Sequence, residues 1–542
     1  MSRLRALPVA VTAVVVSALV GGVLGRSALA TGDRVADRYK VFTAALAAIE
    51  TEYVEPVESD RIVYGAIGGL LQTLDPHSSF LDPRTYAQLR ERQEGRYYGL
   101  GITIQVIDGD ITVVALFEGS PAYRRGIRRG DVIARIKSED TKGWTSDQAV
   151  KELRGPKGST VAISIRRQGY DSLVDLEVER DEISIPTILG AFMIDDRTGY
   201  VRLRDFSETT DRDLGRSLDE LAGKGMTQLL LDLRDNPGGP LDQAIKVSNR
   251  FLQRGDMIVY TRGRVPNSDQ DYRAASEPTV RELPIVVLVN RNSASAAEIV
   301  AGALQDHDRA YVAGETTFGK ALVQSIYRIS QGAGLALTTA RYYTPSGRLI
   351  QRPFDGAFDE YLSYTWRDQA ASRAHEAGDE KETEGGRKVF SGGGIEPDAF
   401  IAGPVEGFNP TRFGRLLYAR RFFAAFAQRF SAEGDTRLGG QAKGQQVVSR
   451  GFEVTDRMVG DFRAFLESEK VRIDDAAFEK DLEFIRAMIR YEVDVELFGV
   501  EDARRHLIAR DPQAQFALGL FPEAIKLSEL SRTRTTAGRV GR

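Results

Sequence analysis

The stretch NRNSASAAEIVAGALQDHDRAYVAGETTFGKALVQ, Asn290–Gln324, decides how the rest of the chain is interpreted. It overlaps PIVVLVN, a continuous apolar run rich in β-branched residues, which predicts a buried central strand. The residues after Ser295, AAEIVAGAL, are small or apolar and favour a helix. Ser295 is therefore expected at a sharp strand-to-helix junction, where free backbone N–H groups and the helix dipole favour developing negative charge.

A lysine follows this serine in a glycine-bounded loop. Lys320 lies 25 residues after Ser295 within GETTFGK, and Gln324 comes four residues later. A serine hydroxyl needs a neighbouring base to attack an amide at neutral pH. An exposed lysine is almost wholly protonated, but burial can lower the pKa of a lysine by about 3–5 units. The pattern predicts a serine nucleophile served by a lysine base that lies in a dry pocket.

Composition excludes several other kinds of site. The chain has 542 residues, enough for three or more domains, and its formal net charge of −4 argues against a dedicated nucleic-acid binder. The absence of cysteine excludes disulfides, thiolate metal sites and cysteine nucleophiles. Only four histidines are present, so a histidine-rich metal centre is not expected and a Ser-His-Asp triad has few candidate bases. We expect neither a metal nor a cofactor.

The N-terminus, residues 1–32, is predicted to be a targeting segment. Arg3 and Arg5 precede an uncharged apolar run, and Ala28-Leu29-Ala30 offers a signal-peptidase cleavage site. The run, Ala6 to Gly25, is also just long enough to span a bilayer, since that takes about 20 residues. A cleaved signal peptide and an uncleaved anchor therefore both remain open. Either one predicts an exported chain, periplasmic or otherwise extracytoplasmic.

Apolar spacing, glycine punctuation and charge divide the rest of the chain into five predicted regions. In chain order they are an N-terminal helical region (33–94), a β-domain with glycine turns (95–183), an α/β core with parallel strands (184–403), a helical C-terminal region (404–530) and a basic tail (531–542). The core carries a charged insertion at about residues 353–391.

The β-rich region carries two motifs with regular glycine spacing. YYGLGITIQVIDGDITVVAL predicts two strands around the turn at Asp108-Gly109, and GSPAYRRGIRRGDVIARI follows it. Together they resemble a PDZ domain. In PDZ domains a glycine loop exposes backbone N–H groups to a peptide carboxylate, and the adjacent strand edge pairs with the peptide. The resemblance assigns peptide binding to Tyr98, Gly99, Leu100, Gly101 and Ile102. A solvated basic face is the interpretation of the nearby arginines Arg124, Arg125, Arg128 and Arg129.

A second glycine-rich turn follows a strand of the buried type in the core. LDLRDNPGG ends in Gly238 and Gly239, and Pro240 suits the start of a helix. Glycines allow backbone N–H groups to approach a ligand closely. The segment lacks the GK[ST] ending of a phosphate loop, so an ordinary β-to-α turn and an oxyanion site both remain open.

Taken together, the motifs resemble the carboxyl-terminal processing (tail-specific) serine peptidases over roughly Val41 to Phe400. Besides the PDZ segment, the resemblance rests on DPHSSFLDP, LDLRDNPGG, NSASAAEIVAGALQD, GETTFGKALVQ, LTTARYYTPSGRLIQ and GIEPD. It implies a multidomain α/β protein. The parts would be an α/β peptidase core of crotonase-like β-α type with an inserted PDZ domain, N-terminal helices and a helical C-terminal region.

The resemblance also assigns catalytic roles. It makes Ser295 rather than Ser293 the nucleophile, Lys320 the base and Gln324 the residue that orients the lysine amine. The oxyanion hole would be formed by the backbone N–H groups of Ala296 and of one glycine in Gly238-Gly239. The chain departs from the family pattern at Arg291, Asn292 and Ala297, where relatives usually carry an acidic residue, a glycine and a serine.

The sequence thus predicts an exported serine endopeptidase that binds protein C-terminal tails through its PDZ domain and cleaves through an acyl-enzyme. Its expected partners are proteins or peptides with apolar C-termini, and an adaptor or activating peptide and a second copy of the chain are further candidates. No nucleic acid is expected, and membrane contact is expected only through the N-terminal segment. The competing hypothesis is a PDZ scaffold that holds partner tails and is catalytically silent or adaptor-dependent.

Overall fold

The computed structural model describes residues 36–540, apart from 168, 281–282, 355–360, 362, 367–374, 377, 404–409 and 433–447. The targeting segment predicted at residues 1–32 lies outside the described residues. Within the described part, no helix combines the length and the apolar character needed to cross a bilayer. The chain divides into two compact units, one formed by Met1–Arg84 with Ile326–Leu337 and the other by Thr85–Ser325 with Thr338–Arg542.

The first unit is mainly helical. It contains a helix over residues 36–52, helix α2 (Ser59–Gln72) and the short strand β1 (Ser79–Leu81), which pairs antiparallel with the start of strand β18 (Gly334–Tyr343). Its helices leave large apolar side chains exposed, among them Tyr39, Val41 and Leu70.

A six-stranded antiparallel sheet, with five strands along its main path, forms the centre of the PDZ segment in the second unit. Its strand order is β3-β4-β5-β7-β8, and the strands span Ile102–Ile107, Asp110–Leu116, Val132–Ile136, Thr160–Arg166 and Val174–Glu179. Strand β6 (Glu139–Asp140) pairs with β5, and helices α4 (Pro121–Arg124) and α5 (Ser146–Leu153) complete the segment. The predicted turn at Asp108-Gly109 joins β3 to β4, with positive φ at both residues as a type I′ hairpin requires.

Helix α3 (Pro83–Glu94) leads into this segment, and a two-stranded ribbon of β2 (Arg96–Gly99) and β9 (Asp181–Ser184) brackets it. A six-stranded sheet then forms the α/β core. Its order is β10-β11-β12-β15-β16-β21, with bounds Ile188–Met193, Thr198–Leu203, Gln228–Asp232, Ile285–Val289, Tyr311–Gly314 and Ala399–Phe400. All neighbours are parallel except β10 and β11, which confirms the predicted α/β core with parallel strands.

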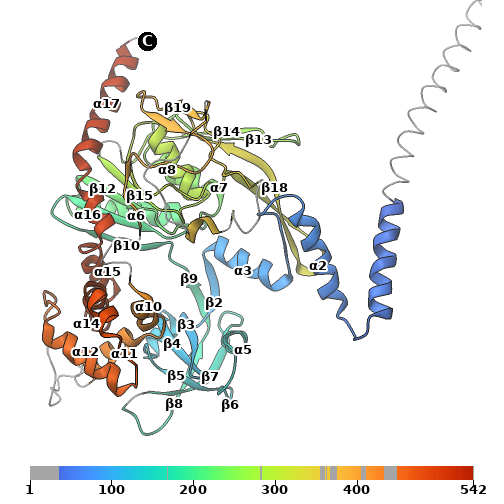
Figure 1. Ribbon diagram of the computed structural model, residues 1–542, viewed down its shortest axis with the longest axis vertical. Helices are drawn as coiled ribbons and strands as arrows, with labels where there is room; N and C mark the ends of the chain where they lie inside the picture. Colours follow the sequence, from blue (N-terminus) through green and yellow to red (C-terminus); the bar gives the residue numbers. More distant parts are fainter. Residues whose placement is uncertain are drawn as a thin grey trace, which may run out of the picture. The chain divides into compact units, whose positions relative to one another are not determined.

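Helices cover both faces of this sheet. Because side chains alternate along a strand, Leu229 and Leu231 of β12 pack with helices α6 (Thr210–Gly223), α7 (Leu241–Asn249) and α8 (Ala296–Asp306), while Leu230 points to the other face. That other face is covered by the C-terminal helices α15 (Val500–Ile508), α16 (Pro512–Leu518) and α17 (Phe521–Val540). Figure 1 shows α16 and α17 beside β12 and β15. The C-terminal helices are therefore part of the core rather than an appendage to it.

A second, antiparallel sheet joins β18 to β13 (Met257–Gly263) and β14 (Gln270–Arg273), and β17 (Leu322–Arg328) pairs with β18 as well. In the charged insertion, β19 (Glu380–Glu382) and β20 (Lys388–Phe390) form a hairpin. Among the described residues, the 3₁₀ turn η1 (Ser330–Gly332) lies in the first unit and η2 (Ser363–Trp366) lies in the second.

The remaining C-terminal helices share a phenylalanine-rich core of their own. They are α10 (Arg412–Ala419), α11 (Phe422–Ala432), α12 (Asp456–Ser468), α13 (Asp475–Lys480) and α14 (Leu482–Leu497). Their interior includes the stacked pair Phe423 and Phe462, whose ring centroids lie 5.0 Å apart. Such aromatic pairs stabilise a core by more than their buried area alone.

This helical group contacts the PDZ segment through the basic run noted in the sequence. Arg129 Nη1 lies 2.6 Å from Glu492 Oε2 and 3.7 Å from Glu496 Oε1, and only 16% of the Arg129 side chain is exposed. Arg421 also donates a hydrogen bond to the carbonyl oxygen of Val114. The interpretation of a solvated basic face is therefore wrong for Arg129, because α14 supplies two carboxylates that no local pattern could indicate.

Candidate active site

Ser295 occupies the junction between β15 and α8, at the N-cap of the helix. Its φ of 55° and ψ of −115° are unusual for a residue with a side chain, and such strain persists only where the surroundings enforce it. Ser295 is half-buried, whereas β15 before it and α8 after it are fully buried. The serine is thus held on a rigid corner of the core, next to the N-terminal backbone N–H groups of a helix.

The carboxylate of Glu298 connects this serine to the lysine loop. Oε2 accepts hydrogen bonds from Ser295 N at 2.8 Å and from Lys320 N at 2.9 Å. Oε1 accepts from Gly319 N at 2.7 Å and from the Thr317 hydroxyl. Glu298 is completely buried, and this burial raises the pKa of its carboxyl although the four donated hydrogen bonds act in the opposite direction.

A buried tyrosine makes a second connection. The hydroxyl of Tyr342, on β18, lies 2.7 Å from Lys320 O and 3.1 Å from Ser295 O. Burial raises the pKa of Tyr342 well above its usual value, so the group is a neutral donor at physiological pH. Glu298 and Tyr342 thus hold the backbones of Ser295 and Lys320 against each other from both their N–H and their C=O groups.

The lysine and the glutamine proposed from the sequence also meet. Lys320 Nζ donates a hydrogen bond to Gln324 Oε1 at 2.9 Å, and both side chains are half-buried. Gln324 lies on β17, directly after the lysine loop. Since a strand points alternate residues to the same face, Leu322 and Gln324 share an orientation that is fixed by the sheet.

The NPGG loop lies against Ser295. Asn236 is fully buried; its carbonyl accepts a hydrogen bond from Ala294 N at 2.8 Å, and its side chain donates to Leu203 O and accepts from Gly238 N. A Cβ on Gly238 would lie 2.7 Å from Ser295 Cβ and 2.8 Å from Ala296 N. The missing side chain therefore leaves open the space in front of the Ala296 N–H and the serine.

Gly239 is fixed in the same loop. Its φ of 156° and a Cβ that would lie 2.3 Å from Phe206 O exclude a larger residue there. In the described part of the chain we find no hydrogen bond from the Gly239 N–H, whereas the Gly238 N–H donates to Asn236. Of the two glycines, Gly239 therefore has the N–H that is available to a ligand.

The departures from the family pattern now have structural roles. Arg291 is buried and pairs with Glu315 at the start of the lysine loop, and it also donates to Gly403 O. Asn292 Nδ2 donates to Asp235 Oδ1 at 2.9 Å. This bond links the NPGG loop to residues 290–295, which we call the nucleophile loop after the role predicted for Ser295. Ala297 is fully buried in α8. Two of the three departures thus add polar connections between the loops that surround Ser295.

A carboxylate and two arginines lie beneath the NPGG loop. Asp232 ends β12, and although its complete burial would raise its pKa, the guanidinium groups of Arg234 and Arg202 lower that pKa to about 2. The hydroxyl of Tyr200 donates to Asp232 Oδ2 at 2.8 Å. The aspartate therefore stays ionised and anchors Arg234 at the start of the loop.

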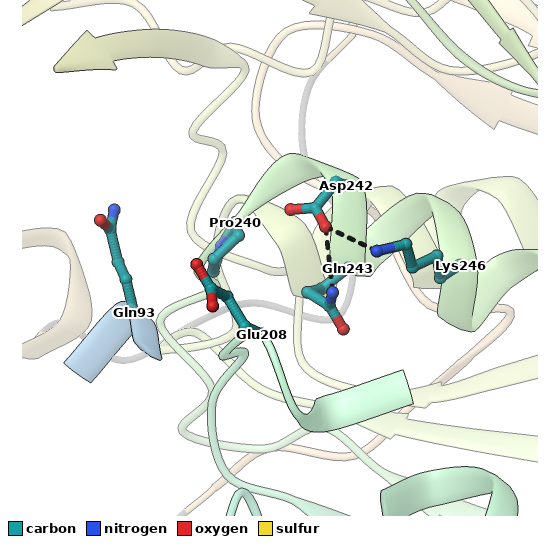
Figure 2. Close-up of a pocket in the computed structure, with 6 residues that line it drawn as sticks. All are labelled: Gln93, Glu208, Pro240, Asp242, Gln243 and Lys246. Atoms are coloured by element: carbon teal, nitrogen blue, oxygen red, sulfur yellow. Dashed lines mark hydrogen bonds and ion pairs between the residues drawn. The ribbon is translucent and has the colours of Figure 1, made fainter. Parts of the chain in front are cut away.

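A cavity of about 530 Å³ opens beside the loop, where α7 begins (Figure 2). It is lined by Gln93, Glu208, Pro240, Asp242, Gln243 and Lys246. Figure 2 shows Asp242 hydrogen-bonded to both Gln243 and Lys246. The charges of Asp242 and Lys246, two of the side chains that line the cavity, therefore neutralise each other. Pro240 directly follows Gly239, which places this polar cavity next to the glycine pair.

The residues assigned to peptide binding lie at the start of the PDZ sheet. Tyr98 and Gly99 end β2, Leu100 and Gly101 connect the strands, and Ile102 begins β3, which is an edge strand. The carbonyls of Leu100 and Gly101 accept hydrogen bonds from Ala122 N and Phe117 N. Gly101 has a φ of 77°, and a Cβ there would lie 2.2 Å from Ser120 Cβ.

Sequence reasoning did not single out Glu298, Tyr342 or Asn236. The spacing of Ser295 and Glu298 is that of a capping box, S-x-x-E, so this signal was present in the sequence. The contacts of Tyr342 and Asn236 depend on long-range packing and had no local signal. Within the described residues, no group of three or more His, Asp or Glu side chains could hold a metal ion.

Comparison with known proteins agrees with this arrangement. Residues 197–356 match peptidase family S41, residues 88–166 match a PDZ domain, and residues 26–85 match the N-terminal domain of the activating protease CtpB. The chain is 41% identical over 307 residues to a carboxy-terminal-processing protease of Bartonella bacilliformis, an alignment that covers 56% of this chain and 70% of the relative. It is 35% identical over 351 residues to the carboxy-terminal processing protease CtpA of Bacillus subtilis, covering 64% and 74% respectively.

These features define a serine-type peptidase with a PDZ domain. The chain belongs to peptidase family S41 and, within it, is similar to the carboxy-terminal processing proteases.

The four hydrogen bonds to Glu298 predict a sharp effect of Glu298→Gln. The amide would place an NH₂ group against backbone donors, which leaves buried polar atoms unpaired at a cost of about 1–3 kcal/mol in folding free energy. We expect peptidase kcat to fall at least about tenfold, because the Ser295 and Lys320 backbones lose a common partner. Steady-state kinetics and thermal unfolding measure the two effects. Glu220→Gln, on the exposed side of α6, is the control, and wild-type kcat in Glu298→Gln would contradict the assigned role.

Proposed function

We propose that this chain is an exported serine endopeptidase in which Ser295 is the nucleophile, Lys320 the general base and Gln324 the residue that orients the lysine amine. The observation that carries the proposal is the hydrogen bond from Lys320 Nζ to Gln324 Oε1 on a loop whose backbone shares two buried partners with Ser295. Partners that fix both backbones confine the two side chains to a narrow range of geometries, as covalent catalysis requires.

The reaction follows from these positions. The Lys320 amine takes the proton of the Ser295 hydroxyl, and the oxygen attacks the carbonyl carbon of the scissile bond. The tetrahedral oxyanion then collapses, and the new amine terminus leaves with the proton that Lys320 returns. Water, deprotonated by the same amine, attacks the acyl carbon. The bond to the Ser295 oxygen then breaks, the substrate leaves with a free carboxylate, and Lys320 returns the proton to the serine oxygen.

The oxyanion would lie in the space that the missing Gly238 side chain leaves open. The Ala296 N–H faces this space at the positive end of α8, and the Gly239 N–H is the second donor that we assign, in preference to Gly238. Each such donor contributes on the order of 3–4 kcal/mol to the transition state in known cases.

The PDZ segment supplies a reader for the substrate's C-terminal tail. Its edge strand β3 has an unpaired side on which an extended peptide can add as a further strand, with the carboxylate at Leu100 and Gly101. The relatives are named for carboxy-terminal processing, which supports substrates recognised by their tails. Proteins with apolar C-termini are the proposed substrate class.

The second candidate function is an enzyme that stays inactive until a partner binds. The PDZ segment, which can bind a tail peptide, and the helical C-terminal region support control by a partner. The exposed apolar side chains of the first unit, such as Tyr39 and Val41, support a homodimer, for which light scattering of residues 33–542 is the measurement.

A catalytically silent scaffold is the least favoured alternative, since the serine, lysine and glutamine are all present.

Removal of either reacting side chain tests the catalytic assignment. Ser295→Ala and Lys320→Met should each lower kcat on an unfolded protein with an apolar tail by more than about 1,000-fold, because nucleophile and base act as a unit. A serine-directed acylating probe should label the wild type and neither variant. Lys388→Met, at an exposed lysine of the β19–β20 hairpin, is the matched control. Full cleavage by Ser295→Ala would refute the nucleophile, and absence of labelling in the wild type would favour the scaffold.

The carboxylate requirement tests the PDZ assignment. A peptide with an apolar, free C-terminus should bind about tenfold or more tightly than the same peptide with a C-terminal amide, because hydrogen bonds to a charged group contribute about 1.5–3 kcal/mol. The measurement is calorimetry with Ser295→Ala, so that no peptide is cleaved. Gly101→Ala should weaken binding of the free acid, since its Cβ would overlap Ser120. Equal affinity for acid and amide would refute tail recognition.

Export rests on the charged and apolar pattern of the first residues. Arg3 and Arg5 before the run from Ala6 to Gly25 support translocation of everything that follows. A phosphatase that is active only outside the cytoplasm, fused after residue 45, should be active in cells. The same fusion with Val15→Arg and Val16→Arg, which interrupt the run, should be inactive. An inactive but stable wild-type fusion would count against export.

A further inference from the structure

The N-terminus of α16 reaches the loop that carries the glycine pair. Asp511 caps this helix by accepting hydrogen bonds at Oδ1 from Gln513 N and Ala514 N. Its other oxygen, Oδ2, lies 2.7 Å from Arg234 Nη2, and Gln513 Oε1 accepts from Arg234 Nη1 at 3.0 Å. Two residues of the C-terminal helical region therefore bind the guanidinium of a core arginine directly.

Arg234 is placed where its position controls the catalytic loop. It lies between Asp232, which it also pairs with at 2.7 Å, and Asn236, which accepts from Ala294 N. Only 7% of the Arg234 side chain is exposed, so water cannot readily replace a hydrogen-bond partner that the guanidinium loses. A shift of Arg234 would move Asn236, two residues further along the chain. Asn236 would in turn move Ala294, which donates a hydrogen bond to it and directly precedes Ser295.

Gln513 also contacts the loops on the other side of the serine. Its Nε2 donates to Ile401 O at 3.4 Å, and a Cβ on Gly403 would lie 2.9 Å from this nitrogen. Gly403 in turn donates to Glu315 Oε1 and accepts from Arg291. The Gln513 amide thus lies between Arg234, which precedes the NPGG loop, and the Arg291–Glu315 pair. That pair joins the nucleophile loop to the lysine loop.

We propose that Asp511 and Gln513 are positioning residues of the active site, which makes the C-terminal helical region a required part of the catalytic apparatus. They act through Arg234 on the oxyanion donors and, for Gln513, through Gly403 on the lysine loop. This inference rests on the proposed function of Ser295. The matches to peptidase family S41 and to the PDZ domain end at residues 356 and 166, so they do not include either residue.

One substitution separates the positioning role of Asp511 from its structural role. Asparagine is as good an N-cap residue as aspartate, so Asp511→Asn can keep the helix cap with its single side-chain oxygen. The NH₂ group of the new asparagine then faces Arg234 Nη2, and because both groups are donors, no hydrogen bond can form between them. Asp474→Asn is the matched control, because Asp474 caps α13 in the same way but is exposed.

Gln513→Met is the second variant. It keeps the length of the side chain. It also leaves the cap of α16 intact, since the cap is made by the backbone N–H groups of residues 513 and 514 and does not involve the side chain of residue 513. It removes the acceptor for Arg234 Nη1 and the donor to Ile401 O. This variant decides the question if Asp511→Asn does not fold.

The experiment uses the full chain and three readouts: kcat and KM on a fluorogenic peptide with an apolar C-terminus, the rate of Ser295 acylation by a serine-directed β-lactone, and thermal unfolding. We expect kcat and the acylation rate to fall about 10- to 100-fold in Asp511→Asn and in Gln513→Met, the loss typical of a small misplacement of reacting groups. KM should change less than about threefold, the unfolding midpoint by a few degrees, and Asp474→Asn should match the wild type.

Acylation and turnover within about twofold of wild type in both folded variants would overturn the proposal. So would a loss that only follows the fraction of unfolded protein, because a purely structural role predicts that result. If the wild type is not acylated at Ser295, the proposed function itself fails. Acylation of the wild type with unchanged rates in the variants defeats the positioning role alone.

Discussion

The carboxylate of Glu298, inside α8, accepts hydrogen bonds from the backbone N–H groups of Ser295 and Lys320 at the same time. A buried carboxylate is costly unless its oxygens are paired, and here each oxygen has two donors. The requirement to satisfy this group forces the nucleophile loop and the lysine loop together. Tyr342 binds both backbones from the carbonyl side, so the spacing of Ser295 and Lys320 does not depend on contacts of their side chains.

The surrounding polar network explains how a strained serine is maintained. The backbone of Ser295 has a positive φ, a conformation that needs support from its neighbours. Asn236 supports it from the NPGG loop, and Arg291 links it to the lysine loop through Glu315. Beneath these loops, Asp232, Arg234 and the C-terminal helix α16 form a buried ionic cluster. The α/β core and the C-terminal region therefore meet in this cluster.

Much of the fold could be predicted because its signals are local. The apolar run before Ser295, the Asp108-Gly109 turn and the alternation of strands and helices each depend on near neighbours in sequence. The residue pattern already indicated a serine with a lysine base, and the resemblance to a peptidase family added the choice of Ser295 over Ser293 and the role of Gln324. The hydrogen bond of Gln324 is with Lys320. The structure brings these two side chains together, while their catalytic roles and the predicted domain boundaries remain predictions.

Long-range pairings could not be predicted. Nothing near Arg129 indicates Glu492, and nothing near Arg234 indicates Asp511, since the partners are far apart in the chain and charged residues are usually solvated. The same holds for the second face of the sheet, where Leu230 packs against helices from the end of the chain. Such contacts arise only when the tertiary fold brings distant elements together.

Trapping of an acyl-enzyme on Ser295 would identify the reacting oxygen without relying on variants. The purified chain, quenched in acid during turnover of a peptide with an apolar C-terminus, is digested and mapped by tandem mass spectrometry. We expect the N-terminal part of the substrate to be esterified to the peptide that contains Ser295, and Gln324→Ala, with a less well oriented amine, to accumulate less of this ester. An acyl group on another residue, or rapid turnover with no covalent intermediate in a quench fast enough to sample it, would rule out Ser295 as the nucleophile of an acyl-enzyme.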